Sequence, residues 1–77
     1  MKIMHIFSQA NRFDDVHIDG TLESLQSLLD SISRSLKTGG STATNHFTAD
    51  GYEYDIYVAL VDDKAADKMP LPYIENE

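Results

Sequence analysis

Six aliphatic residues spaced three and four positions apart form the clearest pattern in the chain. They are Leu22, Leu25, Leu28, Leu29, Ile32 and Leu36. This spacing puts them on one face of an α-helix, so a helix is predicted from Leu22 to Lys37. Thr21 is suited to cap its first turn, and Gly39 to end it in a left-handed conformation. We expect the aliphatic residues to pack on a sheet as core, rather than stay exposed as an interaction stripe, and the intervening serines to face solvent.

A period of two over residues 52–61 predicts a β-strand, with Tyr52, Tyr54, Ile56, Val58 and Leu60 on one face. Asp50-Gly51 favours a two-residue hairpin turn, which makes Thr42 to Ala49 the partner strand. Counting outward from that turn pairs His46 with Asp55 and directs Phe47, Tyr54 and Ile56 toward the core. The other face of the hairpin then carries His46, Thr48, Glu53, Asp55 and Tyr57.

The N-terminal region predicts two further strands, Lys2 to Phe7 and Phe13 to Asp19. In the second, Val16 and Ile18 are expected to point inward, and the outward residues are Asp15, His17 and Asp19. The pattern therefore predicts an α+β fold in the order β-β-α-β-β, with one helix packed on one face of a mainly antiparallel four-stranded sheet.

One domain over residues 1–61 and an acidic, Pro-containing tail over residues 62–77 are predicted. The tail either docks through Leu71, Tyr73 and Ile74 or is frayed, as chain termini often are.

The charge of the chain narrows the range of functions that it can have. It has 77 residues, with 13 acidic against 6 basic side chains and a formal net charge of −7. This balance argues against direct binding of nucleic acid or of an anionic membrane surface. Because the chain has no Cys, it has neither a thiol nucleophile nor Cys-ligated zinc. We expect a cytoplasmic protein, since no targeting signal and no long apolar run is present.

Two clusters of polar residues could carry chemistry. Asp15, His17 and Asp19 resemble a set of metal ligands, but residues two apart on a strand are about 6.6 Å from each other and do not easily converge on one ion. His46 opposite Asp55 resembles an oriented general base, yet no nucleophile is implied beside it. Both clusters are interpreted as structural, so we expect neither enzymatic activity nor a metal or other cofactor.

The open face of the predicted sheet is the favoured binding site. Its residues are Asp15, His17, Asp19, His46, Glu53, Asp55 and Tyr57. Such an acidic surface with an aromatic residue in it complements a basic protein, for example a toxin or a nucleic-acid-binding protein. Three alternatives stay open. They are an ordinary solvated face, a homodimer that buries Tyr57, Val61 and the tail, and a metal-dependent activity that uses His17, His46 and nearby Asp residues.

Several segments resemble small bacterial immunity proteins of polymorphic-toxin systems. These segments are Met1-Lys2-Ile3, Val16-His17-Ile18, Gly20-Thr21-Leu22-Glu23-Ser24-Leu25 and His46-Phe47. The resemblance covers about Met1 to Val61 and implies a cytoplasmic protein that neutralises a toxin by binding it. The size and acidity are also similar to those of phage anti-CRISPR and other anti-defence proteins, several of which mimic nucleic acid.

Overall fold

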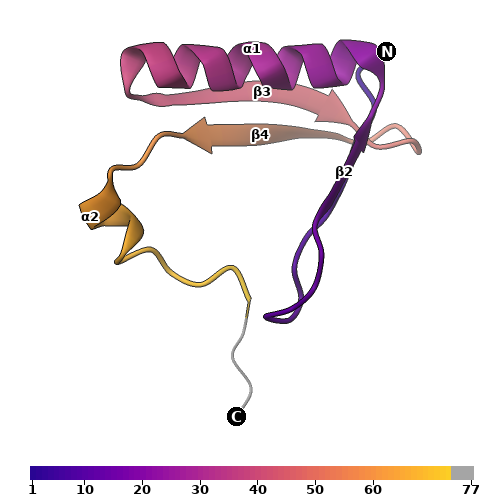
Figure 1. Cartoon of the computed structure of the whole chain (residues 1–77). Coiled ribbons are helices and arrows are strands. Elements are labelled where there is room, and N and C mark those ends of the chain that lie inside the picture. Colours follow the sequence, from indigo (N-terminus) through magenta and orange to yellow (C-terminus); the bar gives the residue numbers. More distant parts are fainter. Residues whose placement is uncertain (74–77) are drawn as a thin grey trace.

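The chain folds as an α+β protein whose long helix lies along a β-hairpin (Figure 1). The computed structural model describes residues 1–73. Its elements are β1 (Met4–Phe7), β2 (His17–Gly20), α1 (Leu22–Thr38), β3 (Ser41–Phe47), β4 (Glu53–Ala59) and α2 (Asp63–Ala66). The predicted order β-β-α-β-β is present, and a short helix follows it in the predicted tail. Ile74 lies outside the described residues.

Both ends of α1 are fixed by the residues that the sequence indicates. The hydroxyl oxygen of Thr21 accepts a hydrogen bond from the backbone N–H of Ser24 at 3.4 Å. At the other end Gly39 has φ of 72°, and its N–H donates to the carbonyl of Ser35 at 2.9 Å. A left-handed residue at this position commonly ends a helix, and glycine adopts it without steric cost. The predicted helix and its caps are confirmed.

The strands form two two-stranded antiparallel sheets, β1–β2 and β3–β4, and not the single four-stranded sheet that was predicted. A parallel bridge between Ile3 and Phe47 connects them, with the N–H of Phe47 donating to the carbonyl of Lys2 at 2.7 Å. Beyond this point the β1–β2 hairpin runs steeply away from β3 and β4 (Figure 1). The ladder between the two hairpins therefore stops after one bridge.

The register between β3 and β4 differs by one residue from the prediction. His46 pairs with Tyr54 and Phe47 with Glu53. The reason is the turn: the N–H of Thr48 donates to the carbonyl of Tyr52, which leaves a three-residue loop with Gly51 at φ of 94°. Such loops use a glycine at positive φ. Because a shift of one residue reverses a strand's faces, β3 is turned over while β4 keeps its predicted orientation.

The face of α1 that lies on the sheet is also not the predicted one. The buried helix residues are Ser24, Ser31 and Ser35, here called the serine face. The apolar stripe is exposed instead; it consists of Leu22, Leu25, Leu29, Ile32 and Leu36. The reversed β3 presents hydroxyl and imidazole groups to the helix, and serines can hydrogen-bond to these whereas leucines cannot. Among residues 1–73, Met4 is the one hydrophobic side chain that is fully buried.

The fold is less compact than that of a typical domain with the same number of residues. Its radius of gyration is 14.2 Å, whereas a compact domain of this length has about 11.5 Å. Within the described part of the chain, every buried side-chain nitrogen and oxygen has a hydrogen-bond partner. Polar pairing between α1 and the sheet thus takes the place that an apolar core holds in most domains.

Candidate interaction surfaces

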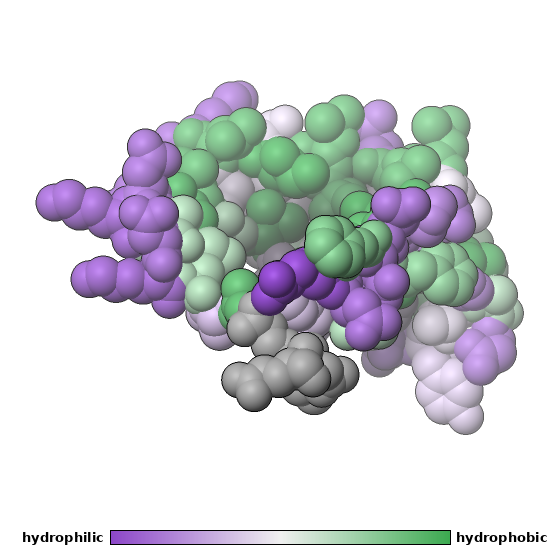
Figure 2. All heavy atoms as spheres, turned by 60° about the horizontal axis from the view of Figure 1, so that its bottom comes forward, coloured by the Kyte–Doolittle hydropathy of each residue, from purple (hydrophilic) through white to green (hydrophobic). Residues whose placement is uncertain are grey.

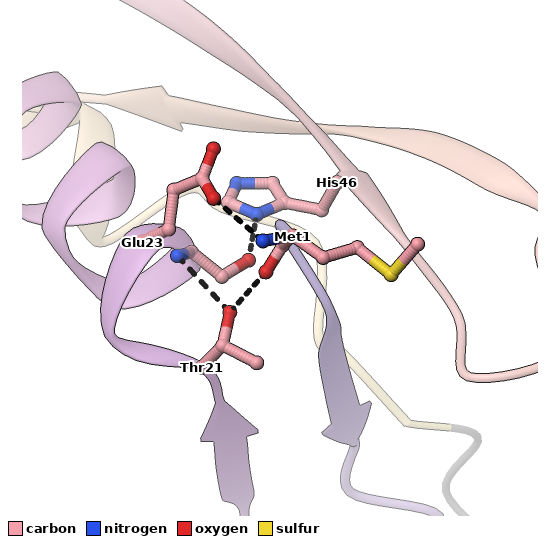
Figure 3. A network of polar contacts seen from close by, with 5 residues as sticks. Met1, Thr21, Glu23 and His46 are labelled. Carbon is pink, nitrogen blue, oxygen red and sulfur yellow. Dashed lines mark hydrogen bonds and ion pairs between the residues drawn. The ribbon is translucent and has the colours of Figure 1, made fainter.

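His46 forms the centre of the contact between α1 and β3. Its Nδ1 lies 2.5 Å from the hydroxyl oxygen of Ser24, and its Nε2 lies 2.7 Å from that of Thr44. Figure 3 shows the ring next to the first turn of α1, where the Thr21 hydroxyl donates to the carbonyl of Met1 at 2.6 Å. These bonds fix the start of the helix on β3.

The remaining contacts along the serine face repeat this polar pattern. The hydroxyls of Ser31 and Thr42 lie 2.5 Å apart, and the Thr42 hydroxyl donates to the Ser31 carbonyl at 2.9 Å. Near the end of the helix, the Ser35 hydroxyl contacts the carbonyls of Gly40 and Val58. The three serines therefore span the length of α1, and each is bonded to β3, to β4 or to the turn before β3.

The Ser24–His46 pair has the atoms of a nucleophile and its base, but not the access that catalysis needs. Both side chains are fully buried, and each imidazole nitrogen already has a hydroxyl partner. Burial, with the positive charge of Lys2, holds the pKa of His46 below its ordinary value, while the carboxylate of Asp55 acts in the opposite direction. This geometry supports a structural role for His46.

The predicted pairing of His46 with Asp55 is wrong. Asp55 pairs with Asn45 across the hairpin, and its Oδ1 accepts from the Asn45 side-chain amide at 3.0 Å. His46 points to the helix and cannot belong to an open acidic face. The sequence signal that could have revealed this is the length of the loop that contains Gly51, because it decides which residues of β3 turn inward.

The other predicted site residues divide between the two hairpins. In β2, His17 lies opposite Phe7 and Asp19 opposite His5, so both alternate with Ile18 and Gly20. Gly20 lies against Met4 and Leu25 of α1, and therefore His17 and Asp19 point away from the helix. Asp15 precedes β2 and is exposed outside any strand.

The residues that the structure does bring together are Glu53, Asp55 and Tyr57 of β4. They alternate with the half-buried Tyr54, Ile56 and Val58 and so share the side of β4 turned away from α1. We call this set the β4 outer face. Tyr57 is 72% exposed. The β1–β2 hairpin, which carries His17 and Asp19, runs in another direction (Figure 1), so these three are the predicted residues that share one face of β4.

The apolar stripe of α1 was predicted to be buried as core, but the structure exposes it to solvent. Its side chains are between 38% and 84% exposed. Ile6 and Ile18 are also exposed. They lie on the same side of their hairpin as Met4 and Gly20, which meets Leu25, so apolar surface continues from α1 onto β1 and β2. Figure 2 shows hydrophobic side chains gathered in one broad area with hydrophilic side chains at its edges.

A pocket of about 410 Å³ opens between β1 and the loop after β3. It is lined by Met4, His5, Ile6, Phe7, Thr48 and Tyr54. Two of these side chains already have backbone partners: His5 Nε2 accepts from the N–H of Ala49 at 2.9 Å, and the Tyr54 hydroxyl donates to the carbonyl of Met4. The pocket walls are thus largely apolar, and their polar atoms hold the two hairpins together.

Within residues 1–73, no group of three or more His, Asp or Glu side chains is arranged to hold a metal ion. No helix in this described part is long and apolar enough to cross a membrane. Comparison with known family models, curated proteins and solved structures found no match for the chain.

Proposed function

We propose that this protein is a non-catalytic binding protein that holds a basic protein partner on the β4 outer face. The observation that carries the proposal is the exposed Tyr57 in line with two carboxylates on one strand face. Residues two apart in a strand are about 6.6 Å from each other, so Glu53, Asp55 and Tyr57 form one continuous row. Tyrosine is enriched among the residues that dominate binding energy, and carboxylates steer and orient a positively charged partner.

The proposed biological role is inhibition by occlusion. The net charge of −7 raises the association rate with a basic surface, and a small domain seated there blocks whatever that surface binds. A toxin, as for immunity proteins, and a nucleic-acid-binding defence complex, as for phage inhibitors, both present such surfaces. Both roles place the protein in the cytoplasm.

The test uses charge reversal on the β4 outer face. The variant Glu53→Lys/Asp55→Lys and the variant Tyr57→Ala should each lose the partner that the wild type retains in affinity purification from the native host. The matched control is Asp30→Lys/Asp67→Lys, which changes the net charge by the same amount at exposed positions on α1 and after α2. The wild-type complex should also weaken as salt rises, because exposed charges are screened.

Equal retention by the reversal variant and the control would contradict the proposal, as would a complex insensitive to salt. A homodimer through Tyr57 and Val61, the alternative from the sequence, uses the same region. It predicts that Tyr57→Ala abolishes self-association, which sedimentation of the purified variant measures directly.

A further inference from the structure

The apolar stripe of α1 has the spacing of a helix-pairing seam. Its residues follow one another at steps of three, four, three and four, which is the a and d pattern of a heptad repeat. Leu22, Leu29 and Leu36 occupy the a positions, and Leu25 and Ile32 the d positions. Within residues 1–73 the seam stays largely open, because all five side chains are exposed and Gly20 of β2 lies against Leu25 alone.

The accessible surface area of the chain is also larger than that of a compact monomeric domain of the same mass. Its accessible surface is 6196 Å² at a mass of 8.6 kDa, whereas a compact monomer of this mass exposes about 4,700 Å². The extended segment after β4 contributes to this excess of about 1,500 Å². For comparison, each subunit of a permanent dimer covers about 1,000 Å² or more. With Met4 as the one fully buried hydrophobic residue, the described chain lacks most of a core.

The uncharged residues beside the seam favour a second copy of this chain as its binding partner. The positions that flank the a and d residues are Gln26, Leu28, Ser33 and Ser35, none of which is charged. Charges at these positions set partner choice and orientation when two helices pair. Here two identical copies can meet without like-charge repulsion at the seam, in spite of their net charge. A two-fold axis pairs the same patch on both copies, as closed dimers require.

We infer that a second copy of this chain covers the apolar stripe of α1, giving a two-fold symmetric dimer whose core lies between the two helices. This inference is independent of the β4 outer face. That face lies on the opposite side of the hairpin from α1, so the dimer presents it twice.

Sedimentation equilibrium of the purified chain tests this. The wild type should have twice the chain mass at micromolar concentration, and its thermal midpoint should rise with protein concentration, as linkage requires for a dimer that unfolds to monomers. Leu29→Ser/Ile32→Ser should raise the dissociation constant by about 100-fold or more. The matched control Met69→Ser/Leu71→Ser removes two exposed apolar side chains after α2 and should leave the dimer intact.

Crosslinking keeps the test decisive if the double serine variant fails to fold. Leu29 is the middle residue of the seam, so it meets its own copy whether the helices run parallel or antiparallel. The chain has no Cys, so Leu29→Cys provides a single site for a short bis-maleimide linker, and Asp30→Cys, on the charged side of α1, is its control. Efficient crosslinking of Leu29→Cys alone supports the dimer.

Three results would overturn the inference: a wild-type monomer with a midpoint independent of concentration, a trimer or larger assembly, or equal crosslinking at positions 29 and 30. The variant Glu53→Lys/Asp55→Lys separates the two proposals, because it should lose the basic partner and remain a dimer.

Discussion

The Nδ1 atom of His46 lies 2.5 Å from the hydroxyl oxygen of Ser24 in the interface between β3 and the first turn of α1. Both residues are fully buried. A buried polar atom without a partner is costly, whereas a satisfied pair contributes modestly and fixes one geometry. This pair therefore specifies where along β3 the helix begins.

Replacing Ser24 with Ala should destabilise the fold. The substitution leaves Nδ1 of His46 buried without a partner, which costs about 1–3 kcal/mol. Urea unfolding at a fixed protein concentration measures the change. The control is Ser33→Ala at an exposed position of the same helix. Both substitutions raise helix propensity alike, so an equal effect of the two would show that the bond to His46 contributes nothing.

Stability should fall as the solution is acidified through the range in which His46 titrates. The pKa of His46 is lowered from its ordinary value of 6.5 in the fold, first by burial and then by Lys2. The unfolded chain therefore binds the proton more readily, so the contribution of neutral His46 is complete above about pH 6.5 and is lost as pH falls through the folded pKa. Unfolding free energies of wild type and His46→Gln across this range should diverge in slope. Parallel slopes for the wild type and His46→Gln would contradict this prediction.

The hydroxyls of Ser31 and Thr42 should behave as a coupled pair. They lie 2.5 Å apart, so removing one leaves the other with fewer partners. We expect Ser31→Ala and Thr42→Val each to cost about 0.5–1.5 kcal/mol, and the double variant to cost less than the two together. Unfolding of all four proteins gives the coupling energy. Strict additivity would mean that the two hydroxyls do not interact.

Gly39→Ala should destabilise the C-terminal end of α1 by about 1 kcal/mol, because a Cβ is disfavoured in the left-handed region. Gly39 has φ of 72°, and a methyl group at this position would meet no neighbouring atom within 4 Å, so the cost lies in the backbone conformation alone. Gly40→Ala is the control, since Gly40 is not at positive φ. Thermal unfolding should show a lowered midpoint for the first variant and little change for the second.

Local signals in the sequence predicted the parts of the fold that depend on neighbouring residues. The helix from Leu22, its cap at Thr21 and its end at Gly39 all follow from adjacent side chains and backbone preferences. The orientation of β4 likewise follows from its alternation, with Tyr54 and Ile56 half-buried as expected. These features can be predicted without knowing which other elements the helix or strand packs against.

Features that depend on contacts between distant segments were predicted wrongly. The side of β3 that faces the helix depends on one extra residue in the loop before Tyr52. Because the prediction used a two-residue turn, it placed His46 on the open face and not in the interface. The helix face then followed the common rule that apolar residues turn inward. Here Ser24 and Ser31 of the helix hydrogen-bond to His46 and Thr42 of β3, and this pairing is visible only once the register is known.

The polar interface between α1 and the β3–β4 hairpin has a consequence for how the helix detaches. Unfolding that exposes apolar surface responds strongly to denaturant and raises the heat capacity, in proportion to the area exposed. Lifting the serine face off the hairpin uncovers serine hydroxyls and an imidazole together with the half-buried side chains of Tyr54, Ile56 and Val58. Hydrogen exchange of α1 amides should therefore show an opening that depends less on denaturant than global unfolding does. The polar contacts that hold α1 on the β3–β4 hairpin are thus directional hydrogen bonds, which water can replace one at a time.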